Sequence, residues 1–249
     1  MISTEYLNRL LNAPTIEELW DMHARSMADY GFDRLIYGYT CYRTKNSLGD
    51  PEDFVVLTTH DSDYMDVFLG EGFYHRAPMV RWALEHDGAC SWRVLQDMVA
   101  SGTLTEDERK VYEFNRSRNV VAGYSISFKS ISPRAKGAIA LTAREGLSQS
   151  DVDSIWARHG DDIQALNNVA HLRILTLPYN APGRALTKRQ REALAWVGDG
   201  KTVQDIAMLM GLTRPTVEKH LRLARDALNV ETTAQAVLKA AFQNQIFIV

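Results

Sequence analysis

The chain has 249 residues, of which 45% are hydrophobic and 24% charged, and its formal net charge at pH 7 is −3. This length allows one or two domains with a buried core, and the only cysteines, Cys41 and Cys90, indicate reduced thiols in a cytosol and exclude a disulfide framework. There is no leader sequence and no long apolar run, so neither a secreted nor a membrane protein is expected.

The front part of the chain predicts a mixture of helices and strands. Three helix starts, at Thr15, Thr105 and Ser148, have a hydroxyl followed three residues later by an acidic side chain. In chain order, the predicted elements are helices over 3–12 and 15–30, strands over 34–42 and 54–59, helices over 61–70, 78–86 and 105–116, strands over 120–128 and 137–143, and a helix over 148–175. The first strand is predicted to be buried on both faces. This order is typical of an α+β fold, and we expect an α/β/α sandwich.

Two prolines and a glycine in the segment 176–185, TLPYNAPGRA, predict a linker. We therefore expect a sandwich domain over residues 1–175 and a separate all-α domain over residues 186–249.

The all-α domain begins with three short helices. The second can start at Thr202, with Asp205 as its capping partner, and stops at Gly211. The third can be capped by Thr213, with Pro215 in its first turn, where a missing N–H has no cost. Two helices joined by a tight turn that contains glycine are typical of a helix-turn-helix.

The third helix has two different faces. Its apolar residues recur at helical spacing and are expected to be buried: Val217, Leu221, Ala224 and Leu228. Its opposite face carries polar and charged residues suited to a DNA groove: Thr216, Glu218, Lys219, Arg222 and Arg225. From Arg184 to Val249 there are 10 basic and 6 acidic residues, which leaves 18 basic and 25 acidic residues in the rest of the chain. A basic tail on an acidic body favours a polyanionic partner.

The segment 186–230 resembles the LuxR-type helix-turn-helix, with GKTVQDIA and TVEKHL matching its motifs GKTxxEIA and TVxxHL. Gln190 departs from the family pattern, which usually has Glu there. The resemblance implies double-stranded DNA as a partner, with base contacts from Glu218, Lys219 and Arg222 and phosphate contacts from Lys201, Thr202, Thr216 and His220. Arg225 is added to the residues expected to contact DNA, because it lies on the same exposed face of the third helix.

The front domain carries no pattern typical of catalysis. We find no nucleophile with a base, no paired carboxylates, no metal-ligand spacing and no phosphate loop, so we expect neither an enzyme nor a metal or cofactor. Instead, aromatic residues gather in its middle: Tyr64, Phe68, Phe73, Tyr74, Trp82, Trp92, Tyr112 and Phe114. Most are expected to fill the core, while some could line a closed apolar pocket.

The order Tyr64, Phe68, Ala77-Pro78, Trp92 and Gly123 resembles the pattern Trp, Tyr, Asp-Pro, Trp and Gly of the autoinducer-binding domain in LuxR-type quorum-sensing regulators. This resemblance implies a cavity between sheet and helices that encloses an N-acyl homoserine lactone. The residues that it places against this small apolar signal are His60, Tyr64, Phe68, Ala77, Pro78, Val80, Trp92, Tyr112, Ala140 and Thr142.

Four positions depart from the family's polar contacts. Tyr64 replaces a Trp that donates to the lactone carbonyl, Ala77 replaces an Asp that accepts from the ligand amide, and His60 and Ala140 stand where Tyr and Ser or Thr are usual. An amide buried without a partner costs about 1–3 kcal/mol. Either His60 or Thr142 supplies the acceptor, or the ligand lacks that amide, or no ligand is needed.

Three hypotheses follow. In the first, a small-molecule effector stabilises the front domain and so controls DNA binding by a cytoplasmic homodimer; a last helix over 233–247 either pairs the tails or packs on the helix-turn-helix. In the second, the protein folds and binds DNA without ligand, and its front domain serves for dimerisation or protein interaction. The third, an enzyme fused to a DNA-binding tail, lacks any supporting catalytic spacing.

Overall fold

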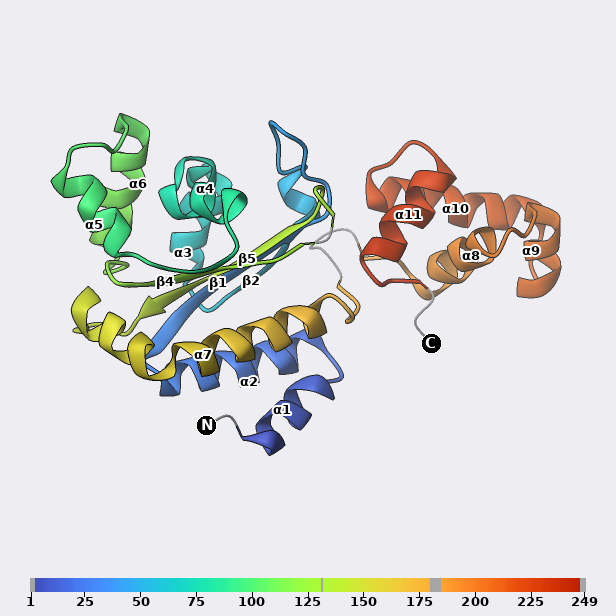
Figure 1. Cartoon of the computed structure of the whole chain (residues 1–249). Coiled ribbons are helices and arrows are strands. Elements are labelled where there is room, and N and C mark those ends of the chain that lie inside the picture. The colour runs from blue at the N-terminus through green and yellow to red at the C-terminus, as the bar shows by residue number, and fades with distance from the viewer. Residues whose placement is uncertain (1–2, 131, 180–184, 247–249) are drawn as a thin grey trace. The chain divides into compact units, whose positions relative to one another are not determined.

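Figure 1 presents a computed structural model of the chain, which describes residues 3–130, 132–179 and 185–246. The chain divides into two compact units, Met1–Leu175 and Thr176–Val249. The first has a β-sheet with helices on both faces, and the described part of the second is helical. The predicted fold class, an α/β/α sandwich followed by an all-α domain, is confirmed.

An antiparallel sheet of five strands, in the order β2-β1-β5-β4-β3, forms the middle of the first unit. The strands are β1 (Phe32–Thr40), β2 (Val55–Thr58), β3 (Gly88–Ser91), β4 (Gly123–Phe128) and β5 (Lys136–Ala143). Ile36 lies opposite Ala140, which lies opposite Ser125 on the next strand. Because successive side chains point to opposite faces of a strand, these three residues share one face of the sheet.

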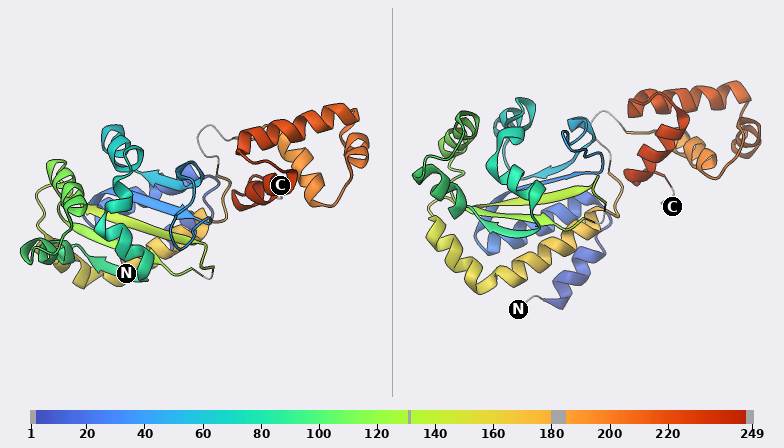
Figure 2. Two further views of the ribbon diagram at one scale, coloured as in Figure 1. Left: turned by 90° about the horizontal axis from the view of Figure 1, so that it is seen from above. Right: turned by 45° about the horizontal axis from the view of Figure 1, so that its top comes forward.

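Helices form a layer on each side of the sheet (Figures 1 and 2). On one side lie α1 (Thr4–Leu11), α2 (Ile16–Asp29) and α7 (Gln149–Ile174). On the other side lie α3 (Ser62–Met65), α4 (Pro78–Glu85), α5 (Arg93–Ala100) and α6 (Glu106–Ser117). The predicted capping boxes at Thr105 and Ser148 are present, and the Thr15 hydroxyl accepts a hydrogen bond from the Glu18 amide.

The sheet face toward α2 and α7 is a packed core. Leu35, Tyr37, Ile139 and Leu141 are at most 2% exposed. The other face is more open, because Ile36 and Gly38 are only half-buried. The prediction that this strand is buried on both faces is therefore wrong for one of them, and the reason is a cavity on that side, described below.

Two elements, β3 and α5, are missing from the prediction. The sequence of β3, GACS, is short and lacks alternation, and its pairing with β4 places it in the sheet. No side chain caps the start of α5, so no local signal marks it. The predicted helix over 61–70 is divided into α3 and a π-helical turn (Asp66–Gly70). The strand predicted from Val120 begins only at Gly123, because the Val120 amide donates to the Asn115 carbonyl at the end of α6.

The second unit contains α8 (Lys188–Gly198), α9 (Val203–Met210), α10 (Arg214–Leu228) and α11 (Thr233–Phe242). Its core contains the four predicted apolar residues of α10, which are at most 5% exposed. Gln190 keeps the capping box of α8, because its side-chain oxygen accepts a hydrogen bond of 2.7 Å from the Thr187 amide.

Two predictions for this unit need correction. Thr213 occupies the N-cap position of α10 but makes no side-chain cap; its hydroxyl lies 2.9 Å from that of Thr216 instead. The last helix ends at Phe242, not at Phe247, because the chain turns at Asn244, whose φ is +51°. Phe247 itself lies outside the described residues.

Candidate ligand cavity and DNA-binding surface

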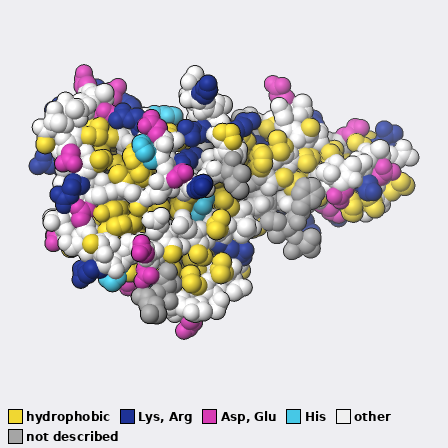
Figure 3. Space-filling view, in the orientation of Figure 1, with side chains coloured by type: hydrophobic (Ala, Val, Ile, Leu, Met, Phe, Trp, Pro, Cys, Tyr) yellow, Lys and Arg dark blue, Asp and Glu magenta, His cyan; other side chains and the backbone are white. Residues whose placement is uncertain are grey.

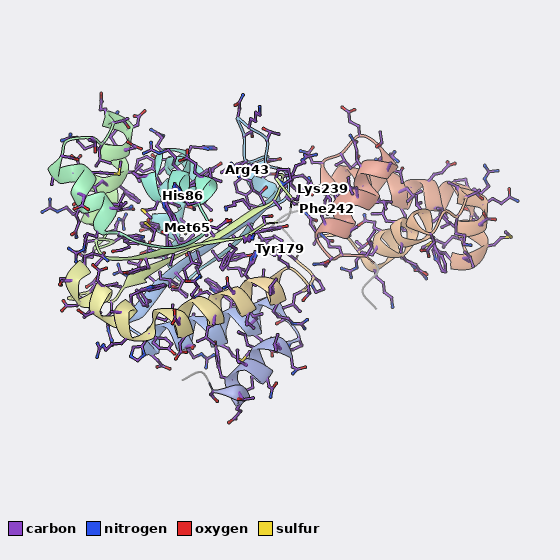
Figure 4. All side chains as sticks on the ribbon, in the orientation of Figure 1. Arg43, Met65, His86, Tyr179, Lys239 and Phe242 are labelled. Carbon is purple, nitrogen blue, oxygen red and sulfur yellow. The ribbon has the colours of Figure 1, made fainter. Side chains whose placement is uncertain are left out.

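A cavity of about 200 Å³ lies between the open face of the sheet and helices α3, α4 and α6. Much of its wall belongs to a hydrophobic cluster that includes Phe54, Tyr64, Phe68, Trp92 and Val111. Side chains of the covering helices extend down toward the sheet, as at Met65, which packs against this cluster (Figure 4).

All ten residues predicted to contact a ligand line this cavity: His60, Tyr64, Phe68, Ala77, Pro78, Val80, Trp92, Tyr112, Ala140 and Thr142. They come from the end of β2, from the covering helices and from β5, so only the tertiary structure brings them together. That they contact a ligand stays a prediction.

Small residues of the sheet leave room for the cavity. Gly38, Ala138, Ala140 and Ser125 line its floor, and a Cβ added at Gly38 would meet nothing within 4 Å. The prediction omits Gly38, Ala138 and Ser125, although the two-residue period of small side chains in β4 and β5 is a signal that could have found them.

Trp92 closes the cavity near β4 and is held by two features. Its indole N–H donates to the Ser125 hydroxyl at 3.0 Å. Its ring lies so close to Gly123 that an added Cβ would be 2.9 Å from it and would also clash with the Leu141 carbonyl oxygen. Gly123 is therefore required by the close packing of this ring, and not by an unusual backbone angle.

Tyr64 uses its polar atom within the protein. Its hydroxyl donates to the side-chain oxygen of Asn115 at 2.8 Å, and burial raises its pKa well above the usual value. The prediction misses Asn115, which also lines the cavity, because nothing in the sequence of α6 distinguishes this residue from a surface asparagine.

His60 stacks on Tyr64, with ring centroids 4.3 Å apart, and its Nε2 is buried without a hydrogen-bond partner among the described residues. Burial, with a smaller contribution from the positive charge of Arg34, lowers the pKa of His60 to about 4. The imidazole is therefore neutral at pH 7, with one nitrogen able to donate and the other able to accept.

Ala77 is 6% exposed and stands at the N-cap of α4, where it offers no side-chain hydrogen bond. Close to it in sequence, Tyr74 is 5% exposed, and its hydroxyl has no partner among the described residues. Near α4, the cavity therefore offers the Tyr74 hydroxyl in place of the carboxylate that the family pattern has at position 77.

The candidate DNA-binding surface is the exposed face of α10 with the start of α9. Lys201, Thr202, Glu218, Lys219 and Arg222 are exposed, and Thr216, His220 and Arg225 are half-buried. Lys201, Glu218 and Lys219 make no ion pair or side-chain hydrogen bond with any described residue. Such unpaired groups are available to phosphates and base edges.

Arg222, Arg225 and Thr202 already have partners within the unit. Arg222 pairs with Asp226 at 2.9 Å, although both side chains are more than half exposed. Arg225 donates to the Thr233 hydroxyl on α11 at 3.0 Å. The Thr202 hydroxyl donates to Asp205 at 2.7 Å in the capping box of α9. Only Nη1 of Arg222 contacts Asp226, so the other guanidinium N–H groups of Arg222 remain available to DNA.

Large hydrophobic side chains are also exposed on the second unit. Met208 and Leu209 on α9 are 70% and 52% exposed, and hydrophobic atoms are visible at that end of the unit in Figure 3. On α11, Ala236 and Ala240 are buried, whereas Leu238 and Phe242 are 55% and 51% exposed. The last helix therefore packs on the helix-turn-helix and also presents an apolar edge.

Within residues 3–130, 132–179 and 185–246, no cluster of three or more His, Cys, Asp or Glu side chains is arranged to hold a metal ion. None of the helices in these ranges has the length and apolar character needed to cross a membrane.

Comparisons with known proteins match both parts of the chain. Residues 15–174 match the model of the family described as "Autoinducer binding domain", and residues 184–240 match that of "Bacterial regulatory proteins, luxR family". The chain is 23% identical to the transcriptional activator protein ExpR of Dickeya dadantii, over 89% of this chain and 88% of that protein.

Among solved structures, the crystal structure of Escherichia coli SdiA resembles this chain with a TM-score of 0.52 and 19% identity, over 98% of this chain and 97% of SdiA. A structure of SdiA in complex with octanoyl-rac-glycerol gives a TM-score of 0.51 at 17% identity, with the same coverage. These likenesses show a shared fold.

Proposed function

Because this chain belongs to the LuxR family of transcriptional regulators, with an autoinducer-binding domain followed by the family's helix-turn-helix, we propose that a small apolar effector in the cavity controls DNA binding by α10. The observation that carries the proposal is the apolar cavity of about 200 Å³ inside the first unit. A molecule that fills it stabilises the folded first unit by mass action, because it binds the folded chain and not the unfolded one.

The DNA contacts are assigned by chemistry. Glu218, Lys219 and Arg222 project from the exposed face of α10 and contact base edges in the major groove. Lys201, Thr202, Thr216, His220 and Arg225 contact the phosphate backbone, which positions the helix without selecting a sequence.

The active species is a homodimer in the cytoplasm, where bacterial DNA is accessible. Leu238 and Phe242 lie four residues apart on one side of α11 and are more than half exposed, which suits pairing with the same helix of a second copy. Two copies of α10 then occupy two half-sites of a symmetric operator.

A selection from random duplexes tests this function. Full-length protein is incubated with the library, the bound duplexes are sequenced, and affinity for the enriched site is measured with and without N-octanoyl homoserine lactone or octanoyl-rac-glycerol. We expect a two-fold symmetric site and a change in affinity of at least tenfold with an effector. Failure to enrich any sequence would overturn the assignment of α10.

A second candidate is a LuxR-type regulator that binds DNA without a ligand. The hydrogen bonds Tyr64–Asn115 and Trp92–Ser125 favour it, because they satisfy two cavity-lining polar groups within the protein. In the same experiment, this regulator would enrich a site as the ligand-free protein, and neither effector would change its affinity.

A further inference from the structure

The polar groups around the cavity limit the chemistry of a ligand. Among the described residues that line it, Lys136 alone carries a charge, and its ammonium donates to the His86 carbonyl and the Asp87 carboxylate at 3.0 and 2.7 Å. An ammonium head group would therefore enter without a counter-charge, which is strongly unfavourable for a buried ion. A carboxylate would meet only the nearby Arg34, whose guanidinium already donates to three backbone carbonyls.

Besides the Tyr74 hydroxyl described above, two polar groups of the cavity wall have no hydrogen-bond partner among the described residues. The Thr142 side chain is 1% exposed, and its hydroxyl makes no hydrogen bond with any described residue. His60 lines the same cavity, and its buried Nε2 is also without a partner. A buried polar group that the protein leaves unpaired is the kind of group that a ligand satisfies.

The sheet places these two groups on either side of Arg34. The Thr59 amide donates to the Leu35 carbonyl, so His60 follows β2 beside Arg34, and Arg34 lies opposite Thr142 on β5. The backbones of His60 and Thr142 are therefore two strand spacings, or about 10 Å, apart. The two side chains and one small head group together span this distance. The Arg34 guanidinium itself donates to the carbonyls of Arg118, Asn119 and Ala143.

We propose that the cavity takes an uncharged amphiphile with a hydroxyl or keto head group, held between His60 and Thr142, and a short alkyl chain against the aromatic wall. This inference rests on the proposed effector function. A neutral imidazole and a hydroxyl can each donate or accept, which matches one oxygen atom.

Hydrogen-bond pairing favours this class over an acyl homoserine lactone. An acyl homoserine lactone brings one N–H and three oxygen atoms that need hydrogen-bond partners, more than His60, Thr142 and the Tyr74 hydroxyl can satisfy. Each polar group buried without a partner lowers affinity about tenfold to a hundredfold.

Calorimetric titration of the full-length protein at pH 7 tests the head group with ligands of equal chain length. We expect 1-nonanol to bind about fivefold to tenfold more tightly than 1-chlorononane, which has the same shape and no O–H. Nonanoate and nonylammonium should bind more weakly than either.

Three variants locate the head group. Thr142→Val and His60→Phe should each bring the affinity ratio of 1-nonanol to 1-chlorononane close to one. Thr40→Val is the matched control, because the Thr40 hydroxyl lines the cavity but already donates to the Leu48 carbonyl at 2.8 Å, and it should leave the ratio unchanged.

Other results would overturn the inference. Equal affinities for 1-nonanol and 1-chlorononane would contradict the assigned head-group site. So would an affinity ratio of these two ligands that Thr142→Val leaves unchanged. Tighter binding of N-octanoyl homoserine lactone, nonanoate or nonylammonium than of 1-nonanol would contradict the proposed ligand class but would still support the effector function. If no probe binds, the effector function fails as well, while sequence-specific DNA binding still tests α10 independently.

Discussion

The hydroxyl of Tyr37, in the middle of β1, lies 2.8 Å from Nδ1 of His171 on α7. His171 also stacks on Phe128, with ring centroids 4.1 Å apart. A basic side chain is thus enclosed in the apolar core between the sheet and helices α2 and α7. Burial lowers the pKa of His171 to about 4, and burial does the same to His23, whose Nε2 bonds to Asn167. Both imidazoles are therefore neutral in the folded protein at pH 7.

These histidines predict a loss of stability in acid. Above pH 6.5 both the folded and the unfolded chain hold neutral imidazoles, so stability does not depend on them. As the pH falls from 6.5 toward 4, only the unfolded chain takes up the protons, and the free energy of unfolding decreases by about 3 kcal/mol for each such histidine. Urea unfolding of the full-length protein between pH 4 and 8 measures this.

His171→Gln identifies the contribution of one residue. Glutamine keeps a hydrogen-bonding group but does not titrate, so the slope of stability against pH should decrease while stability at pH 7 also decreases. An unchanged slope would show that His171 is not the titrating group.

Gly123→Ala should destabilise the first unit. The new methyl group would overlap the Leu141 carbonyl and the Trp92 ring, and such overpacking costs about 1–3 kcal/mol. Gly70→Ala is the control, because a Cβ there would meet nothing within 4 Å. Equal melting temperatures for the two variants would contradict this packing.

Gly38→Val should block the cavity without destabilising the chain. The position is open to the cavity and Val is well suited to a strand, so the side chain occupies ligand space. We expect at least a tenfold loss of 1-nonanol affinity in calorimetry, with a melting temperature at or above that of the parent protein. Retained affinity would place the ligand elsewhere.

Arg222→Ala and Lys201→Ala should weaken DNA binding in different ways. Loss of Arg222 should cost about 1–3 kcal/mol and relax the preference at one base pair. Loss of Lys201, which makes no ion pair or side-chain hydrogen bond with a described residue, should weaken binding to all sequences alike. It should also reduce the slope of log affinity against log salt concentration by about one. Arg189→Ala on α8, where Arg189 pairs with Glu192, is the control. Identical footprints for all three variants would contradict the assignment of α10.

Ala77→Asp tests the missing acceptor. A carboxylate at this buried position of α4 restores the group that the family pattern has, and should raise the affinity for N-octanoyl homoserine lactone by about one to two decades. Thermal melting with and without the lactone measures the gain. No gain at any chain length would mean that the cavity excludes the lactone for reasons other than this acceptor.

The sequence was most informative where structure is local. The apolar spacing of α10 and the capping pairs of α2, α6, α7 and α9 lie within one or two helical turns, so they could be predicted without knowing what packs against them. It was less informative for β3 and α5, because strand pairing with β4 and packing of Trp92, not local signals, place them.

By itself, then, the sequence determined the helix-turn-helix and its buried and exposed faces, and it predicted ten of the residues that line the cavity. The tertiary structure alone decided which polar groups remain unpaired inside it. Tyr64 and Trp92 are satisfied by Asn115 and Ser125, from distant parts of the chain, while His60 Nε2 and the Tyr74 hydroxyl are not. The reason is that the hydrogen-bonding capacity left over in a buried site depends on every neighbour that the fold brings there, and those neighbours are separated in this chain by tens of residues.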